Sequence, residues 1–80
     1  MPVPRYFFNV RGGAAPFEDE EGWVHADEEK ALDGATTAAR GLIATDVLEG
    51  MLDLESRIDV EDVDGTLLFT VSFASVVAQP

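Results

Sequence analysis

Two runs of alternating apolar and polar residues flank an Asp-Gly pair late in the chain, and this arrangement constrains the fold more than any other feature. The runs are SRIDVEDV at 56–63 and TLLFTVSF at 66–73, and the pair is Asp64-Gly65. Alternation with a period of two is typical of strands that bury one face. Asp-Gly favours a type I′ turn, because both central residues of that turn have positive φ. The sequence therefore predicts an antiparallel hairpin.

The same segment carries some of the acids of a calcium loop. With Gly65 at the sixth position of an EF-hand loop, Asp62 and Asp64 would supply the third and fifth positions. Val60 and Val71 would then stand at the first and twelfth positions, and neither side chain can bind a cation. The flanking residues also have the period of strands and not of helices. We predict a turn, and weak, unspecific attraction of divalent cations is the alternative.

Before this hairpin, the pattern predicts two more strands joined by a loop. RYFFNV at 5–10 alternates and is predicted to be a strand, while the glycines and the proline of RGGAAPFEDEEG at 11–22 predict a loop. WVHA at 23–26 is predicted to be a short second strand, with Trp23 toward the core and Val24 facing outward.

A helix is predicted between Asp27 and Gly50. An aspartate can accept an N–H of the first turn, and glycine commonly follows the last turn. Asp46 interrupts the apolar stripe of this helix, so either the core contact ends near Ala44 or the chain kinks and Asp46 caps a final turn. The stripe consists mostly of alanine, which allows close packing: Ala31, Leu32, Ala35, Ala38, Ala39, Leu42 and Ile43.

The order strand, strand, helix, strand, strand predicts an α+β fold, ββαββ, in one small domain that spans residues 1–80. We expect a four-stranded antiparallel or mixed sheet with one helix packed on one face. The first and last strands are the most apolar and are expected at the centre, whereas the acids of the third strand suit an edge, which gives the order 2-1-4-3. The final ASVVAQP segment is expected to extend the last strand by a few residues.

The charge of the chain argues against several classes of function. Sixteen acids against five Lys and Arg residues give a net charge of −11, so we expect no binding of nucleic acid or of anionic membrane surfaces. No apolar run approaches the roughly 18 residues of a membrane span, and the N-terminus does not resemble a signal peptide. The expected location is the cytoplasm. Solubility explains the charge, and attraction to a basic partner or to cations is the alternative.

The sequence contains no recognisable catalytic or metal-binding constellation. It has no cysteine, and its one histidine, His25, makes a poor zinc site alone. None of its hydroxyl residues lies in a G-x-S-x-G elbow, and RGG at 11–13 lacks the pattern of a phosphate loop. The acidic run at 18–21 is predicted to be a solvated loop. We therefore expect that the protein is not an enzyme and has no catalytic residue, metal site or cofactor.

Four segments together resemble a family of short bacterial proteins of unknown function. They are RYFFNV at 5–10, DEEG at 19–22, AAR at 38–40 and IDVEDVDGTLLFTVSF at 58–73. The resemblance covers nearly the whole chain, and its strongest markers are the R-Y-F-F-x-V opening and the D-x-x-G sequence before the helix. These markers are architectural, so the resemblance implies no site residues. The chain departs from the family at Trp23 and His25, where plainer aliphatic residues are expected, and in the glycines of its helix.

These observations predict a non-catalytic protein-interaction or regulatory module. Alternation places Phe7 and Leu68 on the face of the sheet that the helix leaves uncovered, with Val24 and Thr70 near them. We expect these four residues to form an interface with a partner protein or with a second copy in a two-fold dimer. The alternatives are an exposed face on a monomer, an acidic antitoxin-like or inhibitor-like partner of a basic protein, and a weak binder of divalent cations.

Overall fold

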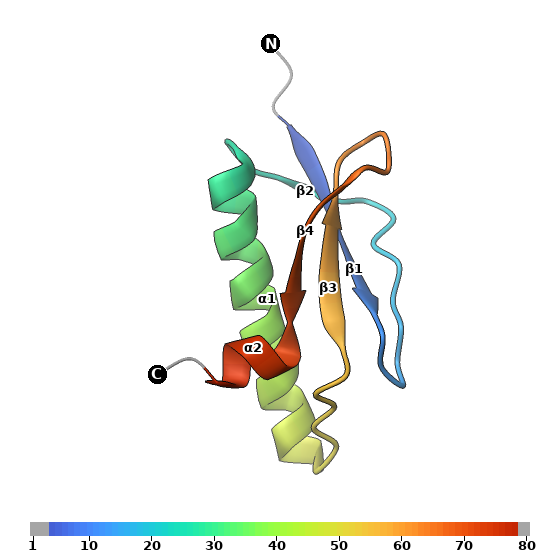
Figure 1. Cartoon of the computed structure of the whole chain (residues 1–80), viewed down its shortest axis with the longest axis vertical. Coiled ribbons are helices and arrows are strands. Elements are labelled where there is room, and N and C mark those ends of the chain that lie inside the picture. The colour runs from blue at the N-terminus through green and yellow to red at the C-terminus, as the bar shows by residue number, and fades with distance from the viewer. Residues whose placement is uncertain (1–3, 79–80) are drawn as a thin grey trace.

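The computed structural model describes residues 4–78, which form a four-stranded sheet with a long helix along one face (Figure 1). The elements are β1 (Arg5–Arg11), β2 (Trp23–Val24), α1 (Glu28–Glu49), β3 (Arg57–Glu61), β4 (Leu67–Ser72) and α2 (Phe73–Ala78). All neighbouring strands are antiparallel. The predicted α+β fold and the order ββαββ are confirmed. Within the described residues, neither helix is long and apolar enough to cross a lipid bilayer.

The strands lie in the order β2-β1-β3-β4, so the predicted order 2-1-4-3 is wrong. β3 is a central strand, and its Ile58 and Val60 are 1% and 0% exposed. The acids of β3 do not mark an edge, because neighbouring strands supply their partners. Asp59 accepts a hydrogen bond from Thr70 of β4 and forms an ion pair with Arg11 of β1. A charge on a central strand is tolerated where such partners are present.

The hairpin between β3 and β4 is confirmed, but its turn is not of type I′. Gly65 has φ of 81°, and no non-glycine residue among those described has positive φ, so Asp64 does not have the conformation that type I′ requires. The Gly65 N–H donates to the carbonyl of Asp62 at 3.0 Å. The Asp62 carboxylate accepts the N–H groups of Asp64 and Thr66 at 2.9 and 3.0 Å. An aspartate at the first position stabilises a type I turn in this way.

The segment after β4 forms the short helix α2, so the expected extension of the last strand is wrong. The Phe73 N–H still donates to the carbonyl of Ser56, but the Ser72 hydroxyl then accepts the N–H of Ser75 at 3.0 Å and caps a helical turn. Phe73 is buried beneath this turn. The last part of the predicted extension, residues 79–80, lies outside the described residues.

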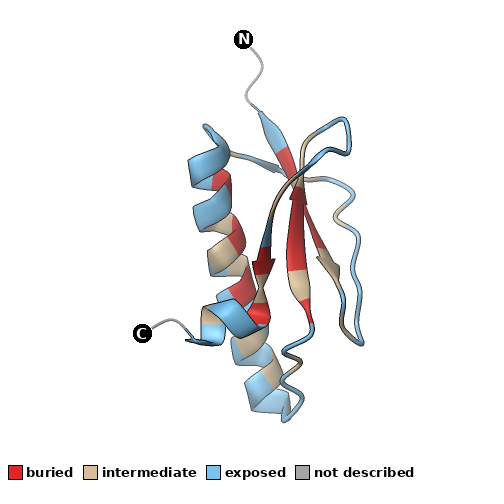
Figure 2. Cartoon of the chain, viewed as in Figure 1, coloured by how far each residue is buried: buried red, intermediate tan, exposed pale blue. Residues whose placement is uncertain are grey.

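The core lies between α1 and the sheet (Figure 2). Ala31, Ala35 and Ala39 of α1 are completely buried, which confirms the alanines of the predicted stripe, whereas Leu32 and Leu42 of that stripe are exposed. Small side chains let the helix backbone lie close to the strands, where dispersion contacts are most numerous. The sheet contributes Tyr6 and Phe8 from β1, and the other buried apolar residues are Ile58, Val60, Val71 and Phe73.

Both predicted ends of α1 are confirmed. The Asp27 carboxylate accepts the N–H of Lys30 at 2.9 Å, and Gly50 has a left-handed φ of 72°. The helix continues unbroken through Asp46, while Ala39 is its last fully buried residue. Of the two alternatives, core contact therefore ends before the helix does. The last turns of α1 extend beyond the strands and are exposed (Figures 1 and 2).

Candidate protein-interaction groove

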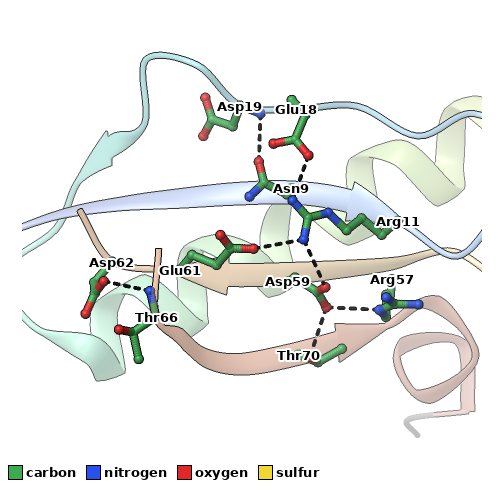
Figure 3. A network of polar contacts seen from close by, with 10 residues as sticks. All are labelled: Asn9, Arg11, Glu18, Asp19, Arg57, Asp59, Glu61, Asp62, Thr66 and Thr70. Atoms are coloured by element: carbon green, nitrogen blue, oxygen red, sulfur yellow. Dashed lines mark hydrogen bonds and ion pairs between the residues drawn. The ribbon is translucent and has the colours of Figure 1, made fainter. Parts of the chain in front are cut away.

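The uncovered face of the sheet is occupied by a network of charged side chains (Figure 3). Arg11 bonds Glu18 at 2.6 Å and Glu61 at 3.1 Å, and the Nε of Arg57 donates to Asp59 at 3.0 Å. The pKa of Arg11 is raised, mainly by its hydrogen bond with Glu18. This face has a polar centre and not the apolar patch that the sequence suggested.

The four residues predicted to form an interface do not lie together. Phe7, Val24 and Thr70 are on the uncovered face, opposite Glu61, Arg5 and Asp59 in the strand register. Leu68 packs against the core instead. The reason is a β-bulge: Val60 pairs with Phe69 and Glu61 with Leu67, so Leu68 is the extra residue and the alternation of β4 shifts there.

The strand order separates these residues further, because β3 lies between β1 and β4. The expected proximity of Phe7 and Leu68 is therefore wrong. A contact of Phe7, Val24 or Thr70 with a partner stays a prediction.

Asp19, the first residue of the D-x-x-G marker, holds the loop between β1 and β2 against the edge of β1. Its carboxylate accepts the N–H of Phe8 at 3.1 Å and that of Gly22 at 3.0 Å. Its own N–H donates to the Asn9 side chain at 2.8 Å. Phe17 exchanges two backbone hydrogen bonds with Val10, at 2.8 and 2.9 Å. The acidic run is therefore not only a solvated loop, since Asp19 completes the hydrogen bonding of a strand edge.

The His25 ring packs against the edge of the core. Its ring stacks on Phe8 with centroids 5.7 Å apart and planes at 19°. A Cβ added to Gly34 of α1 would lie 2.7 Å from the His25 ring, so this helix glycine makes room for the histidine. A side chain at position 34 would therefore compete with the His25 ring for the same space. The buried Nε2 of His25 has no hydrogen-bond partner among residues 4–78.

The face that carries α1 is only partly covered by it. α1 packs against β3 and β4, and α2 packs against α1 and β4. Beside α1, over β1, lies a groove of about 740 Å³. Ala38, Gly41 and Leu42 of α1 form one wall, and Phe17 and Trp23 stand on the opposite side. We call this the α1–β1 groove.

Large apolar side chains of the α1–β1 groove remain in contact with water. Trp23 pairs with Tyr6 and so lies on the helix side of the sheet, yet it is 59% exposed, because α1 lies over the other strands. Phe17 is 64% exposed and Leu42 is 40% exposed. Met51, at the far end of the groove, is 61% exposed. Contiguous exposed apolar surface of this kind marks binding sites.

The charged residues that line the groove are all acidic: Asp19, Asp46 and Asp53. Asp53 accepts the N–H groups of Ala14 at 2.8 Å and Glu55 at 3.0 Å. The bond from Ala14 is the main reason that the pKa of Asp53 is lowered, so its carboxylate is ionised at neutral pH. None of the described residues that line the groove is Lys, Arg or His.

Sequence reasoning missed this groove, although two signals were present. Phe17 is the only large apolar residue of the loop at 11–22, and MLDL at 51–54 places three apolar residues directly after the helix cap Gly50. These four apolar residues lie outside every predicted strand and helix, and all of them remain exposed in the structure.

A family model described as a domain of unknown function (DUF6894) matches residues 5–74. No curated protein and no solved structure matches the chain.

Proposed function

The chain belongs to the DUF6894 family of domains of unknown function, and from its own geometry we propose that it is a non-catalytic module that binds an apolar, basic segment of another protein. The observation that carries the proposal is the α1–β1 groove. Its volume of about 740 Å³ is within the range of ligand-binding clefts, roughly 300–1,000 Å³. Trp23, which stands on one side, belongs to the residue type most enriched where binding energy is concentrated.

The charge of the groove supports a basic partner. Every charged residue that lines the groove is acidic, and the whole chain has a net charge of −11. Complementary charge speeds association and disfavours acidic competitors. The apolar walls would supply most of the affinity, at about 25 cal/mol for each Å² removed from water.

The use of the ionisable groups supports a non-catalytic role. Asp19, Asp53 and Asp62 accept backbone N–H groups, and Asp59 accepts from Arg57 and Thr70, so these carboxylates act as structural acceptors. Among residues 4–78, no group of three or more His, Asp or Glu side chains is arranged to hold a metal ion.

Site-specific photo-crosslinking in cells of the source organism tests this function. A photoreactive phenylalanine analogue at Leu42 places the reactive group in the groove, whereas the same analogue at Leu32 lies on α1 outside it. The two leucines are matched in exposure, at 40% and 41%. We expect one protein to be captured from position 42 and not from position 32. Equal capture from both positions, or none from either, would contradict the proposal.

Of the earlier alternatives, two fit the geometry less well and one fits it equally. An acidic antitoxin-like or inhibitor-like role would use the same groove and would differ only in what the partner does. Weak binding of divalent cations by the turn is less supported, because two backbone N–H groups already occupy one oxygen, Oδ1, of the Asp62 carboxylate. A dimer through the uncovered face is less supported, because charged side chains occupy its centre.

A further inference from the structure

Building on the proposed function, we propose that the segment bound in the α1–β1 groove is a basic amphipathic α-helix, seated on β1 beside α1 as the second helix of this face. The inference rests on three observations: the width of the sheet, the hydrogen-bonding state of the β1 edge and the charge of the groove.

The sheet is wide enough for two helices on one face. Neighbouring strands lie about 4.8 Å apart, so four strands extend over roughly 15–20 Å. A helix with its side chains is only about 10 Å across and covers about two strands. α1 packs mainly against β3 and β4, and its first half also covers Tyr6 and Phe8 of β1. The groove is the vacant place beside the second half of α1, over the end of β1 at Val10. The wall of α1 presents the small residues Ala38 and Gly41 there, which allow a second helix to approach closely.

The edge of β1 excludes an extended peptide as the occupant. A bound strand needs free N–H and C=O groups along a sheet edge. Beside the groove these groups are already used, because Phe17 pairs with Val10 and the Asp19 carboxylate takes the N–H of Phe8. A strand laid in the groove would bury backbone groups without partners, which is costly. A helix satisfies its own backbone and needs only an apolar surface.

The charges of the groove favour a bound helix that is positively charged. Asp46 lies on the wall formed by α1, Asp19 lies at the β1 side, and Asp53 lies near Ala14 where the groove ends. Lysine or arginine on the flanks of an apolar stripe would lie near these carboxylates. A second copy of this chain would instead add eleven negative charges to a surface that is already acidic. The occupant is therefore a segment of a different, basic protein.

Three synthetic peptides test this inference with the full chain. The residues of α1 that line the groove run from Ala38 to Asp46, about 12 Å of helix axis, so peptides of about 14 residues are long enough. The first has Leu and Lys at helical spacing, the second has the same composition in strict alternation, and the third has Leu and Glu at helical spacing. Trp23 is the only tryptophan of the chain, so its emission reports occupancy directly. We expect the first peptide to shift this emission to the blue and to bind at least about tenfold more tightly than the others.

A matched pair of charge variants separates local recognition from general attraction. Asp46→Lys and Asp33→Lys change the net charge equally and lie on the same helix, but only Asp46 lines the groove. The two positions are about 20 Å apart along the helix, which is more than the Debye length of about 8 Å at physiological salt. We expect Asp46→Lys to weaken binding of the first peptide about tenfold and Asp33→Lys to change it less than about threefold. Lysine near the helix C-terminus is favourable, so Asp46→Lys should remain folded.

The outcomes distinguish this inference from the proposed function. If cross-linking at Leu42 captures a partner but the Leu and Lys helix does not bind, the function stands and the basic helix is wrong. Equal binding of the alternating or the acidic peptide, or equal weakening by both charge variants, also overturns the basic helix. A dimer in sedimentation equilibrium that is lost in Gly41→Phe would assign the groove to a second copy and overturn it too.

Discussion

Under α1, Val60 and Val71 pack against alanines and are 0% and 7% exposed, whereas beside α1, on the same face of the sheet, Trp23 and Phe17 are 59% and 64% exposed. The covered half is stabilised by burial of apolar surface. In the half beside α1, where the groove lies, Asp19 and Asp53 hold the loops by accepting hydrogen bonds from backbone N–H groups. A fold can thus keep a large apolar surface accessible if its neighbouring loops do not depend on that surface for their stability.

The first prediction compares a phenylalanine from each half and has the largest expected effect. Phe73 is 2% exposed, so Phe73→Ala should lower the free energy of unfolding by about 3–5 kcal/mol. Phe17→Ala should change it by less than about 1 kcal/mol, because that ring is mostly in water. Urea unfolding followed by circular dichroism measures both. If Phe73→Ala does not fold, Phe73→Leu should still fold, with a loss of about 1 kcal/mol.

One outcome of this experiment would contradict the contrast between the two halves. Equal losses for Phe73→Ala and Phe17→Ala would mean that the two halves are stabilised in the same way. The side of the groove that contains Phe17 would then be part of the core, and the groove would be closed in solution.

The second prediction concerns the edge of β1, whose backbone groups bond to the loop between β1 and β2. Asp19→Ala would leave the N–H groups of Phe8 and Gly22 without their acceptor, and we expect a loss of about 1–3 kcal/mol in the free energy of unfolding. Glu20→Ala, at an exposed neighbouring acid, is the matched control and should have almost no effect. Hydrogen exchange at the Phe8 amide gives the local measurement. An Asp19→Ala variant with unchanged Phe8 protection would show that the carboxylate does not hold this edge.

The sequence predicts the elements of the fold better than their arrangement. Asp27, Gly50 and the alanine stripe define α1 through local rules of capping and periodicity, and the structure follows them. The strand order failed because the acids of β3 were interpreted without their partners. Arg11 lies far away in sequence, and no local rule predicts that it pairs with Asp59 and Glu61 across β1 and β3.

The candidate site was harder to predict than the fold. The expected interface relied on strict alternation through β4, and one bulge residue, Leu68, is enough to reverse it. The groove depends on where α1 lies across the width of the sheet. Periodicity shows which side of a helix is buried, but it does not show which strands that side covers.

The third prediction uses the two glycines of α1, which the sequence alone cannot distinguish. A Cβ at Gly34 would lie 2.7 Å from the His25 ring, whereas a Cβ at Gly41 would meet nothing within 4 Å. We expect Gly34→Ala to destabilise the fold by about 1–2 kcal/mol, because the added methyl overpacks a filled site. Gly41→Ala should stabilise it by up to about 1 kcal/mol through helix propensity. Thermal unfolding of both variants measures the difference, and effects of the same sign would contradict the assigned roles.

The last prediction concerns the acid stability of the groove end and has the smallest expected effect. The pKa of Asp53 is lowered from its ordinary value of 3.8, chiefly by the hydrogen bond from the Ala14 N–H. A carboxyl group whose folded pKa lies below its unfolded pKa binds more protons in the unfolded chain. Its contribution to stability is therefore complete above 3.8 and is lost as the pH falls through the folded pKa.

The variant Asp53→Asn removes this titration while keeping an oxygen acceptor for the Ala14 N–H. We expect the wild type to be more stable than the variant at neutral pH, and we expect this difference to shrink below pH 4 as Asp53 becomes protonated. Urea midpoints measured between pH 2 and pH 7 give the comparison, with Asp64→Asn in the exposed turn as the control. A difference that stayed constant over the whole range would mean that the Asp53 charge does not hold the loops at the end of the groove. Other interactions would then have to hold the loops in the half beside α1, and the contrast with the half under α1 would be weaker.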